Sequence, residues 1–395
     1  MTSLGKPLRK QLKILLIVVL LAVAFRSLGI SIVDIGLPSF VLSLAGSLTS
    51  YGIIIGVFSV TQSIFQFPYA FASDRFGRRK IVLIGLSIYI SGTFLCFFAQ
   101  DILQLIIYRA IQGIGAYTSI LQAIIGDIFE KDQQAMNIGY FGGIFIGGYI
   151  AKFLGFRSIF SISGFFITVI AVLLIVALKE EKPQNEINGN YRRNTMHLNF
   201  ESIKILLRNN QFRFSVILNC VRWFLFGGIV AYLIWVLQVQ FNLDEINTSY
   251  ILIVIVFLYV AFVFVSSRLI DKQGPRKMMI IGQSIVIIFG IPFFVETLIH
   301  NLIIFGVLCA IIGIGIALFD PAGNALLLKV IEDINPELKG SGIGFNNAIG
   351  FFFSALAPII FSLIGEIIIF APFYLIIALM MFSVIISYTC IKKCY

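Results

Sequence analysis

Five ionisable side chains lie inside long apolar stretches of this sequence: Arg26, Asp34, Arg109, Arg222 and Asp320. Charged groups at membrane depth are costly, and they commonly bind protons, ions or charged solutes. If each stretch is a membrane-spanning helix, Asp34 and Arg109 fall at similar depth. An ionised carboxyl pairs with a neighbouring arginine, whereas a protonated one releases it. We therefore expect Asp34 and Arg109 to couple proton movement to conformation, with a static ion pair between helices as the alternative.

Arg26 and Arg222 form a second candidate site. They occupy equivalent places 196 residues apart, and Asn219 lies one turn before Arg222. Two arginines that face one cavity would bind a phosphate or carboxylate through bidentate hydrogen bonds. Two alternatives remain open for Arg26, which are pairing with Asp34 and binding backbone carbonyls. Arg222 has no acidic residue within its own apolar stretch, 213–240.

Asp320 is followed directly by Pro321. A proline has no backbone N–H and interrupts the hydrogen-bond ladder of a helix. An aspartate at such a break can accept hydrogen bonds from the freed amides. We favour this capping role for Asp320 over a role in ion coupling.

Twelve apolar segments must position these residues. The chain has 395 residues, 59% of them hydrophobic, and its mean hydropathy is +1.00, which is typical of an integral membrane protein. Most segments reach the ~20 residues that cross a bilayer as a helix, and the ~10-residue alternating segments of a membrane β-barrel are absent. The sequence predicts an all-α membrane protein with twelve transmembrane helices, at 13–43, 48–72, 81–99, 102–125, 136–155, 158–178, 213–240, 248–267, 278–298, 301–327, 343–364 and 367–390.

The basic residues are concentrated on one side of the predicted membrane. The formal net charge is +10; with both termini in the cytoplasm, the inner segments carry 24 of the 29 Lys and Arg residues. The outer loops carry only Lys152 and Arg157. This is the positive-inside pattern, and it explains the charge without a nucleic-acid partner. We expect a multi-pass protein of the cell membrane.

Metal, cofactor and enzyme chemistry find no support in the sequence. His197 and His300 are the only histidines and the five cysteines are scattered, so no His/Cys metal cluster is predicted. The chain has no Gly-x-Ser-x-Gly motif and no carboxylate pair at catalytic spacing. We expect no enzyme activity, no cofactor and no metal.

An internal repeat divides the chain into halves. The heptapeptide Asp-Arg-Phe-Gly-Arg-Arg-Lys at 74–80 returns as Asp-Lys-Gln-Gly-Pro-Arg-Lys at 271–277, and Gly113-Ile-Gly115 returns 200 residues later. The sequence therefore predicts two six-helix halves in parallel orientation, 1–178 and 213–395, joined by a polar cytoplasmic linker at 179–212. Two related halves around a midplane cavity are an architecture of secondary transporters.

With these motifs, the whole chain resembles the major facilitator superfamily. The heptapeptide resembles the family's loop signature, Gly-x-x-x-Asp-Arg-x-Gly-Arg-Arg-Lys, although Ala70 replaces the leading glycine. The resemblance implies a gate that latches the cytoplasmic side while the cavity faces outward. The alternative is that the loop arginines only fix topology. The predicted gate residues are Asp74, Arg75, Gly77, Arg78, Arg79 and Asp127 in the first half, and Asp271, Gly274 and Arg276 in the second.

Asp127 is the expected partner of Arg78, at the cytoplasmic end of the fourth segment. At the offset of 200 that aligns the glycine pairs, Asp127 corresponds to Leu327. The second copy of the latch therefore lacks this carboxylate, and we expect it to be weaker.

Two further motifs resemble those of proton-coupled drug antiporters. Arg109-x-x-Gln112-Gly resembles the fourth-helix motif associated with proton coupling. Gly143, Gly147 and Gly148 resemble the fifth-helix motif Gly-Pro-x-x-Gly-Gly without its proline, and such small residues let membrane helices pack closely. The fifth segment also looks one or two turns short for this family.

We therefore expect a monomeric secondary transporter of small solutes, most simply a proton-coupled exporter of lipophilic compounds. One alternative is uptake or exchange of organic anions or phosphorylated metabolites. Another is a membrane scaffold or receptor without transport activity. Besides Arg26, Asn219 and Arg222, we expect the substrate cavity to include Gln62, Gln66, Tyr117, Tyr232 and Trp235. The expected partners are the solute, protons and the lipid bilayer.

Overall fold

The computed structural model describes residues 6–115, 129–177 and 200–391. Within these ranges every regular element is a helix. The first half contains α1 (Lys6–Ser43), α2 (Leu48–Phe76), α3 (Arg78–Phe98), α4 (Ile102–Ile114), α6 (Phe129–Leu154) and α7 (Ser158–Ala177). They are followed by α8 (Phe200–Arg208), α9 (Asn210–Trp235), η2 (Val236–Gln240), α10 (Glu245–Gln273), α11 (Pro275–Gly290), η3 (Ile291–Phe294), α12 (Glu296–Ile299), α13 (Leu302–Ile334), η4 (Pro336–Leu338), α14 (Lys339–Ile367) and α15 (Ala371–Thr389).

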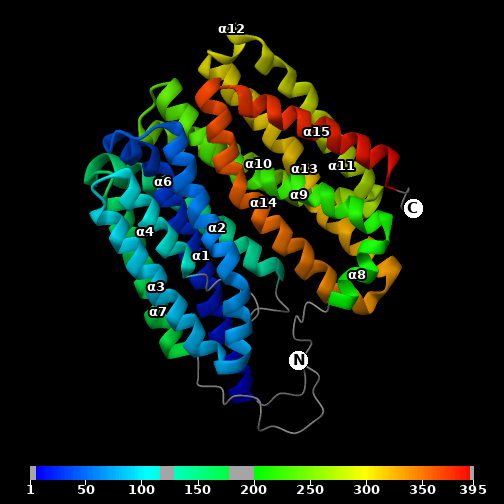
Figure 1. Ribbon diagram of the computed structural model, residues 1–395, viewed down its shortest axis with the longest axis horizontal. Coiled ribbons are helices and arrows are strands. Elements are labelled where there is room, and N and C mark those ends of the chain that lie inside the picture. The colour runs from blue at the N-terminus through cyan, green and yellow to red at the C-terminus, as the bar shows by residue number, and fades with distance from the viewer. Residues whose placement is uncertain (1–5, 116–128, 178–199, 392–395) are drawn as a thin grey trace. The chain divides into compact units, whose positions relative to one another are not determined.

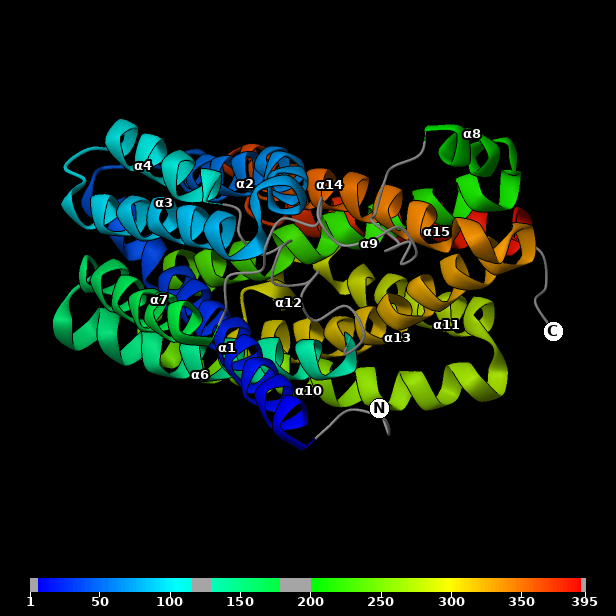
Figure 2. The ribbon, with the colours of Figure 1, turned by 90° about the horizontal axis from the view of Figure 1, so that it is seen from below.

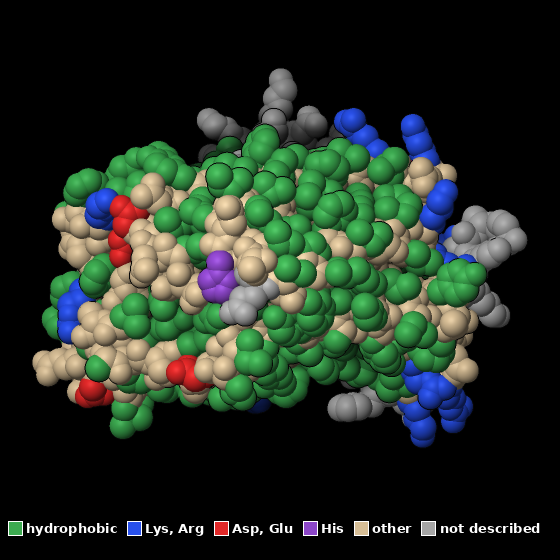
Figure 3. Space-filling view, turned by 90° about the horizontal axis from the view of Figure 1, so that it is seen from above, with side chains coloured by type: hydrophobic (Ala, Val, Ile, Leu, Met, Phe, Trp, Pro, Cys, Tyr) green, Lys and Arg blue, Asp and Glu red, His purple; other side chains and the backbone are tan. Residues whose placement is uncertain are grey.

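Ten of the described helices are long and apolar enough to cross a membrane, and two shorter apolar helical stretches, Ile102–Ile114 and Gly142–Leu154, accompany them. This confirms the prediction of an all-α protein with twelve transmembrane helices. Hydrophobic side chains cover most of the face drawn in Figure 3, as a lipid-facing surface requires. Helix α6 begins at Phe129 and runs for 26 residues, against 29 in α14, and only its part Gly142–Leu154 is apolar enough to be counted, so the fifth membrane helix stays shorter than its counterpart in the second half.

The chain forms two compact units. The first consists of Met1–Gly189 with Asn242–Tyr250, and the second of Asn190–Phe241 with Ile251–Tyr395. In the first unit α1 packs against α6 and α7, and α4 packs against α2 and α3 (Figure 1). A Cβ at Gly143 would lie 2.3 Å from the carbonyl oxygen of Leu28, and one at Gly147 would lie 2.9 Å from the Cα of Ile32. Glycines in α6 therefore permit its close approach to α1.

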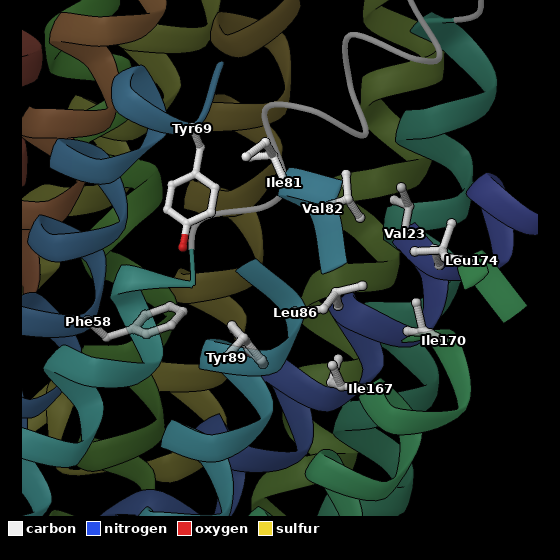
Figure 4. Close-up of a cluster of buried hydrophobic side chains, with 11 residues drawn as sticks. Val23, Phe58, Tyr69, Ile81, Val82, Leu86, Tyr89, Ile167, Ile170 and Leu174 are labelled. Atoms are coloured by element: carbon white, nitrogen blue, oxygen red, sulfur yellow. The ribbon is translucent and has the colours of Figure 1, made fainter. Parts of the chain in front are cut away.

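A cluster of buried apolar side chains joins four helices of the first unit. It contains Val82 and Leu86 of α3, Ile170 and Leu174 of α7, and Val23 of α1. Figure 4 shows these side chains together with Phe58 of α2 and Tyr89 of α3. The cluster holds α3 firmly between α2 and α7, and it thereby fixes the polar residues that α3 carries.

In the second unit α9 packs against α14 and α13, and α11 packs against α13 and α15 (Figure 2). Aromatic rings fill part of its core. The rings of Phe293 and Phe373 stack with centroids 4.3 Å apart, and Phe305 meets both of them edge-on. Tyr232 of α9 also meets Phe373 edge-on.

The segment Asn242–Tyr250, which opens α10, is packed within the first unit. Lys152 forms an ion pair with Asp244, and Ser39 donates a hydrogen bond of 2.5 Å to the carboxylate of Glu245. The Lys152 ammonium and the backbone N–H of Asn247 both lower the pKa of the Asp244 carboxyl. Lys152, one of the two basic residues predicted in outer loops, thus has an acidic partner.

Arg157, the other basic residue predicted in an outer loop, also has local partners. Its Nη1 donates to the carbonyl of Phe97 over 2.9 Å. Its guanidinium lies 5.3 Å from the centroid of the Phe40 ring. Both basic residues that depart from the charge pattern are therefore used in local contacts.

The repeated heptapeptides form two equivalent turns. Gly77 separates α2 from α3 with φ of 93°, and Gly274 separates α10 from α11 with φ of 82°. Residues with a Cβ rarely adopt this backbone conformation.

An arginine after each turn binds the end of another helix. Nη2 of Arg79 donates to the carbonyl of Ile175 near the end of α7, over 3.1 Å. Arg276 donates to the carbonyls of Ser387 and Tyr388 near the end of α15, over 2.9 and 2.6 Å. Helix C-termini carry unpaired carbonyls and partial negative charge, which arginine satisfies. Each half therefore ties its loop to its last helix in the same way.

We predict that Gly77→Ala and Gly274→Ala each lower the free energy of unfolding by roughly 1–3 kcal/mol, because alanine resists a positive φ. Gly306→Ala is the matched control, because Gly306 lies within α13 and a Cβ there meets nothing within 4 Å. That control should be neutral or stabilising by up to about 1 kcal/mol. Thermal or denaturant unfolding in detergent measures all three, and a Gly77→Ala protein as stable as wild type would contradict the prediction.

Candidate functional site

Arg109 is held by a chain of hydrogen bonds between α4 and α3. Its Nη1 donates to Gln112 Oε1 over 2.7 Å, and Gln112 Nε2 donates to Thr93 Oγ1 over 2.7 Å. Thr93 in turn donates to the carbonyl of Tyr89 over 2.7 Å. All four residues are buried. One helical turn separates Arg109 from Gln112, so the amide orients the guanidinium within its own helix.

An aromatic ring holds the face of the same guanidinium. Cζ of Arg109 lies 4.5 Å from the centroid of the Phe58 ring, a cation–π distance. The Phe58 ring meets Tyr89 edge-on. Nε of Arg109 is buried and has no hydrogen-bond partner. Arg109 is therefore fixed by uncharged groups, and no carboxylate among the described residues forms an ion pair with it.

Asp34 is the acidic group nearest to this network in the described part of the unit. Its side chain is half-buried, and it lies within electrostatic range of Arg109, Tyr51 and Tyr140. No ion pair within 4.0 Å joins Asp34 to Arg109. The expected direct pair is thus replaced by a longer-range interaction between Asp34 and Arg109.

Arg26 lies in the same unit and completes its set of membrane-embedded charges. Its side chain is half-buried, and its Nε is buried with no hydrogen-bond partner. Tyr89 lies within electrostatic range of Arg26, Asp34 and Arg109. No ion pair joins Arg26 to Asp34 among the residues that the structure describes.

The second unit contains a different arrangement around Arg222. Nη1 of Arg222 forms an ion pair of 2.5 Å with Asp320 Oδ1, and its Nε donates to Asn219 Oδ1 over 2.8 Å. Tyr259 of α10 donates to the other oxygen of Asp320 over 3.1 Å. The guanidinium also lies 4.9 Å from the centroid of the Trp223 ring. Three helices, α9, α10 and α13, thus meet in one polar cluster.

Two expectations are corrected by this cluster. Asp320 does not cap amides beside Pro321 in the described contacts; its two oxygens bind Arg222 and Tyr259. Arg222 is also not an unpaired cation left for a solute. Its acidic partner, Asp320, lies on α13, outside the stretch 213–240 that contains no acidic residue. Sequence reasoning missed this pair because its partners are 98 positions apart, and separation along the chain does not report which helix faces meet.

Two predicted cavity residues belong to the core of the second unit. Tyr232 is buried, donates to the carbonyl of Ile369 and meets Phe361 edge-on. Trp235 is also buried. Their amphipathic rings fill space between helices, and the role of these two residues in lining a substrate cavity stays a prediction. Gln62 and Gln66 are half-buried and have partners, and Tyr117 lies outside the described residues.

The predicted gate residues are described in part. Arg75 is exposed and lies 5.4 Å from the ring centroid of Phe76, while Asp271 is exposed. The side chains of Asp74 and Arg78, and all of Asp127, lie outside what the structure describes.

Gly148, the third glycine predicted to let helices pack closely, faces the backbone of Glu245. A Cβ added at Gly148 would lie 2.7 Å from the carbonyl oxygen of Glu245.

Three residues of the two networks were not anticipated, namely Phe58, Thr93 and Tyr259. They are an aromatic and two hydroxyl side chains within apolar helices, and such residues are common in membrane spans. Only the contacts with Arg109, Gln112 and Asp320 distinguish them. Within the described ranges no three His, Cys, Asp or Glu side chains could share a metal ion.

Comparison with known proteins gives one family. Residues 19–358 match the Major Facilitator Superfamily. The fold is similar to the crystal structure of a bacterial homologue of the human lysosomal transporter Spinster, with a TM-score of 0.76, 14% identity, and coverage of 97% of this chain and 94% of that one.

Three curated relatives match to different extents. An uncharacterized transporter of Buchnera aphidicola is 34% identical over 172 residues, which is 41% of this chain and 43% of the relative. Multidrug resistance protein 3 of Bacillus subtilis is 33% identical over 34% of this chain and 26% of its own length. The riboflavin transporter RibZ of Clostridioides difficile is 23% identical over 89% of this chain and 88% of its own length. The first two matches thus span less than half of those relatives.

We predict that Gln112→Ala lowers the free energy of unfolding by roughly 1–3 kcal/mol, because it leaves buried donors of Arg109 unsatisfied. Gln104→Ala on the same helix is the matched control, because Gln104 binds only the exposed backbone N–H of Gln100. The control should change stability by less than about 0.5 kcal/mol. Denaturant unfolding of both variants in detergent is the measurement, and equal stabilities would show that the network does not hold Arg109.

Proposed function

Because the chain belongs to the major facilitator superfamily, we propose that it moves small solutes across the membrane by alternating access, with protons as the coupling ion and efflux of lipophilic compounds as its activity. The membrane location is that of the family. The cell membrane, cytoplasmic termini and a monomeric state are part of the proposal. The charge pattern along the chain supports the orientation.

One observation carries the proton-coupling proposal. Asp34 is half-buried and forms no ion pair with any residue that the structure describes, while Arg109 is fixed by Gln112 and Phe58 within electrostatic range of it. A carboxyl in this position senses a constant positive charge, and it can still take up a proton without breaking a salt bridge. Asp34 is therefore proposed to carry the proton. Arg109 supplies the positive charge that acts on it, and Gln112 holds Arg109 in position.

Two observations favour lipophilic solutes over anions. The charge of Arg222 is balanced inside the second unit by Asp320, so this arginine is not an open anion site. One relative with 33% identity over a third of this chain is a multidrug resistance protein. A mostly apolar transporter with few membrane-embedded charges suits lipophilic solutes.

An organic-anion activity is the second candidate, and Arg26 is the observation that favours it. Its Nε is buried without a hydrogen-bond partner. A carboxylate or phosphate oxygen would satisfy this donor. Arg26 is the residue to which an anion-binding role is assigned in this alternative.

The two heptapeptide turns are proposed to form the cytoplasmic gate. Gly77 and Gly274 give each loop its reversal, and Arg79 and Arg276 fasten it to the end of α7 or α15. These contacts keep each loop in a fixed position on its own unit. Asp74 and Asp271 are then the groups proposed to make and break contacts during the cycle.

We predict that Asp34→Asn keeps solute exchange but weakens accumulation driven by a pH gradient. The probe is tetraphenylphosphonium, a lipophilic cation, in liposomes containing the purified protein. Removing one coupled proton should lower accumulation about tenfold at a gradient of one pH unit, because each proton contributes the free energy of that gradient. Counterflow of the probe without a gradient should continue at a rate within about twofold of wild type, since the amide resembles the protonated acid.

Asp101→Asn is the control for this experiment. Asp101 caps the first turn of α4 outside the apolar part of the helix, and asparagine caps equally well. Gradient-driven accumulation by Asp34→Asn at the level of this control would refute a coupling role for Asp34. Absence of counterflow in wild type, for every probe tested, would instead support a scaffold or receptor without transport activity.

We predict that lipophilic cations stabilise the purified protein more than anions do. Thermal unfolding is measured with tetraphenylphosphonium and ethidium, with riboflavin, and with benzoate and glucose 6-phosphate. Binding at 100 times the dissociation constant stabilises a protein by about 2.7 kcal/mol, which is a readily measured shift. Stabilisation by the two anions alone, lost in Arg26→Gln, would replace efflux of lipophilic compounds with the anion activity.

A further inference from the structure

The cluster of Arg222, Asp320 and Tyr259 lies at the middle of membrane-length helices. Arg222 is twelve residues from the start of α9, and Asp320 is eighteen residues from the start of α13 and fourteen from its end. At ~1.5 Å per residue, Asp320 lies about 20 Å or more from each helix terminus. A carboxylate at this depth is a candidate for function rather than for surface solvation.

The two charged partners differ in their access to solvent. The side chain of Asp320 is 22% exposed, whereas that of Arg222 is 8% exposed. Arg222 is also held by Asn219 and by the face of Trp223. The carboxylate is therefore the more exposed partner, and the guanidinium is the one that other groups hold in place.

The hydrogen bonds around Asp320 permit two protonation states. When ionised, the carboxylate accepts from Arg222 at one oxygen and from Tyr259 at the other. When protonated, it has one O–H to donate, and the Tyr259 hydroxyl can accept as well as donate. Tyr259 can thus remain bonded to Asp320 in both states, whereas the ion pair with Arg222 exists only in one.

The titratable groups bonded to Asp320 in the described part of the unit come from two helices. From α9 the facing group is Arg222, and from α10 it is Tyr259. Helix α11 meets this part of α13 through Gly282, which faces Gly315 and Phe319. The carboxylate of Asp320 is therefore bound by one cation and one phenol.

We propose that Asp320 is a second proton carrier, so that each transport cycle exchanges two protons, one at Asp34 in the first unit and one at Asp320 in the second. A proton from water binds Asp320, and its ion pair with Arg222 breaks. Its release to water on the other side restores the carboxylate and the pair. This inference rests on the proposed transport function, and it goes beyond it by assigning a stoichiometry and a second site.

The test measures protons per solute directly. Purified wild type and variants are placed in liposomes with the membrane potential clamped to zero, and the final accumulation ratio of tetraphenylphosphonium is measured at several pH gradients. For antiport the logarithm of that ratio rises by one unit per pH unit for each coupled proton. We expect a slope of about two for wild type, about one for Asp320→Asn and about zero for the Asp34→Asn, Asp320→Asn double variant.

Matched variants separate titration from structure. Asp320→Glu keeps the carboxyl and should keep a slope of about two, and Asp101→Asn should match wild type. An unchanged slope in Asp320→Asn, or a wild-type slope of about one, overturns the proposal.

Two further measurements keep the proposal testable if the solute or the variant fails. Counterflow of tetraphenylphosphonium without a gradient reports transport alone, so its absence counts against the proposed function and not against Asp320. Infrared difference spectra of the purified protein between acidic and alkaline pH report carboxyl protonation without any solute. All carboxyl groups contribute to the protonated-carboxyl band, so we expect this band to be weaker in Asp320→Asn than in wild type and in Asp320→Glu, and the same band intensity in Asp320→Asn as in wild type would refute the assignment.

Discussion

A charge in the middle of a membrane-spanning helix must be compensated, and this constraint shapes both polar networks. Removing one partner of a buried ion pair typically costs about 3–5 kcal/mol. The second unit compensates Arg222 with the carboxylate of Asp320. The first unit holds Arg109 with the amide of Gln112 and the ring of Phe58, which orient the guanidinium but leave its charge. Only Arg222 therefore depends on the ionisation state of its bonded partner.

The internal repeat supplies a common frame but not a common site. Gly77 and Gly274 form the same turn, and the arginine after each turn binds the end of the last helix of its half. The acidic residues follow no such symmetry. At the offset of 196, Asp34 corresponds to Val230, and at the offset of 200, Asp320 corresponds to Ile120. The turn and the arginine that binds a helix end occur twice, because each half has to hold its own loop. The carboxylate in each half is instead positioned by the local network of that half.

Hydropathy was sufficient to predict the helices, because a helix that crosses lipid must be apolar along most of its length. It failed at α6, where the helix begins at Phe129 and includes polar residues that a hydropathy pattern excludes. Within the site, Arg109 and Gln112 were predictable together because they are one helical turn apart. The pairing of Arg222 with Asp320 was not, because it depends on how α9 and α13 are rotated against each other. The burial of Tyr232 was not predictable for a related reason, since an amphipathic ring suits a cavity wall and a helix interface equally well.

The hydrogen bonds of Asn219 show how a titrating group can be separated from the contacts that hold the helices. Its Nδ2 donates to the carbonyls of Ser215 and Gly323, and its Oδ1 accepts from Arg222. These bonds join α9 to α13 through uncharged groups, and none of them involves Asp320. In the first unit the bond between Gln112 and Thr93 joins α4 to α3 in the same manner. Uncharged amides therefore join the helices and orient the guanidinium groups through contacts that do not depend on the charge of either carboxyl.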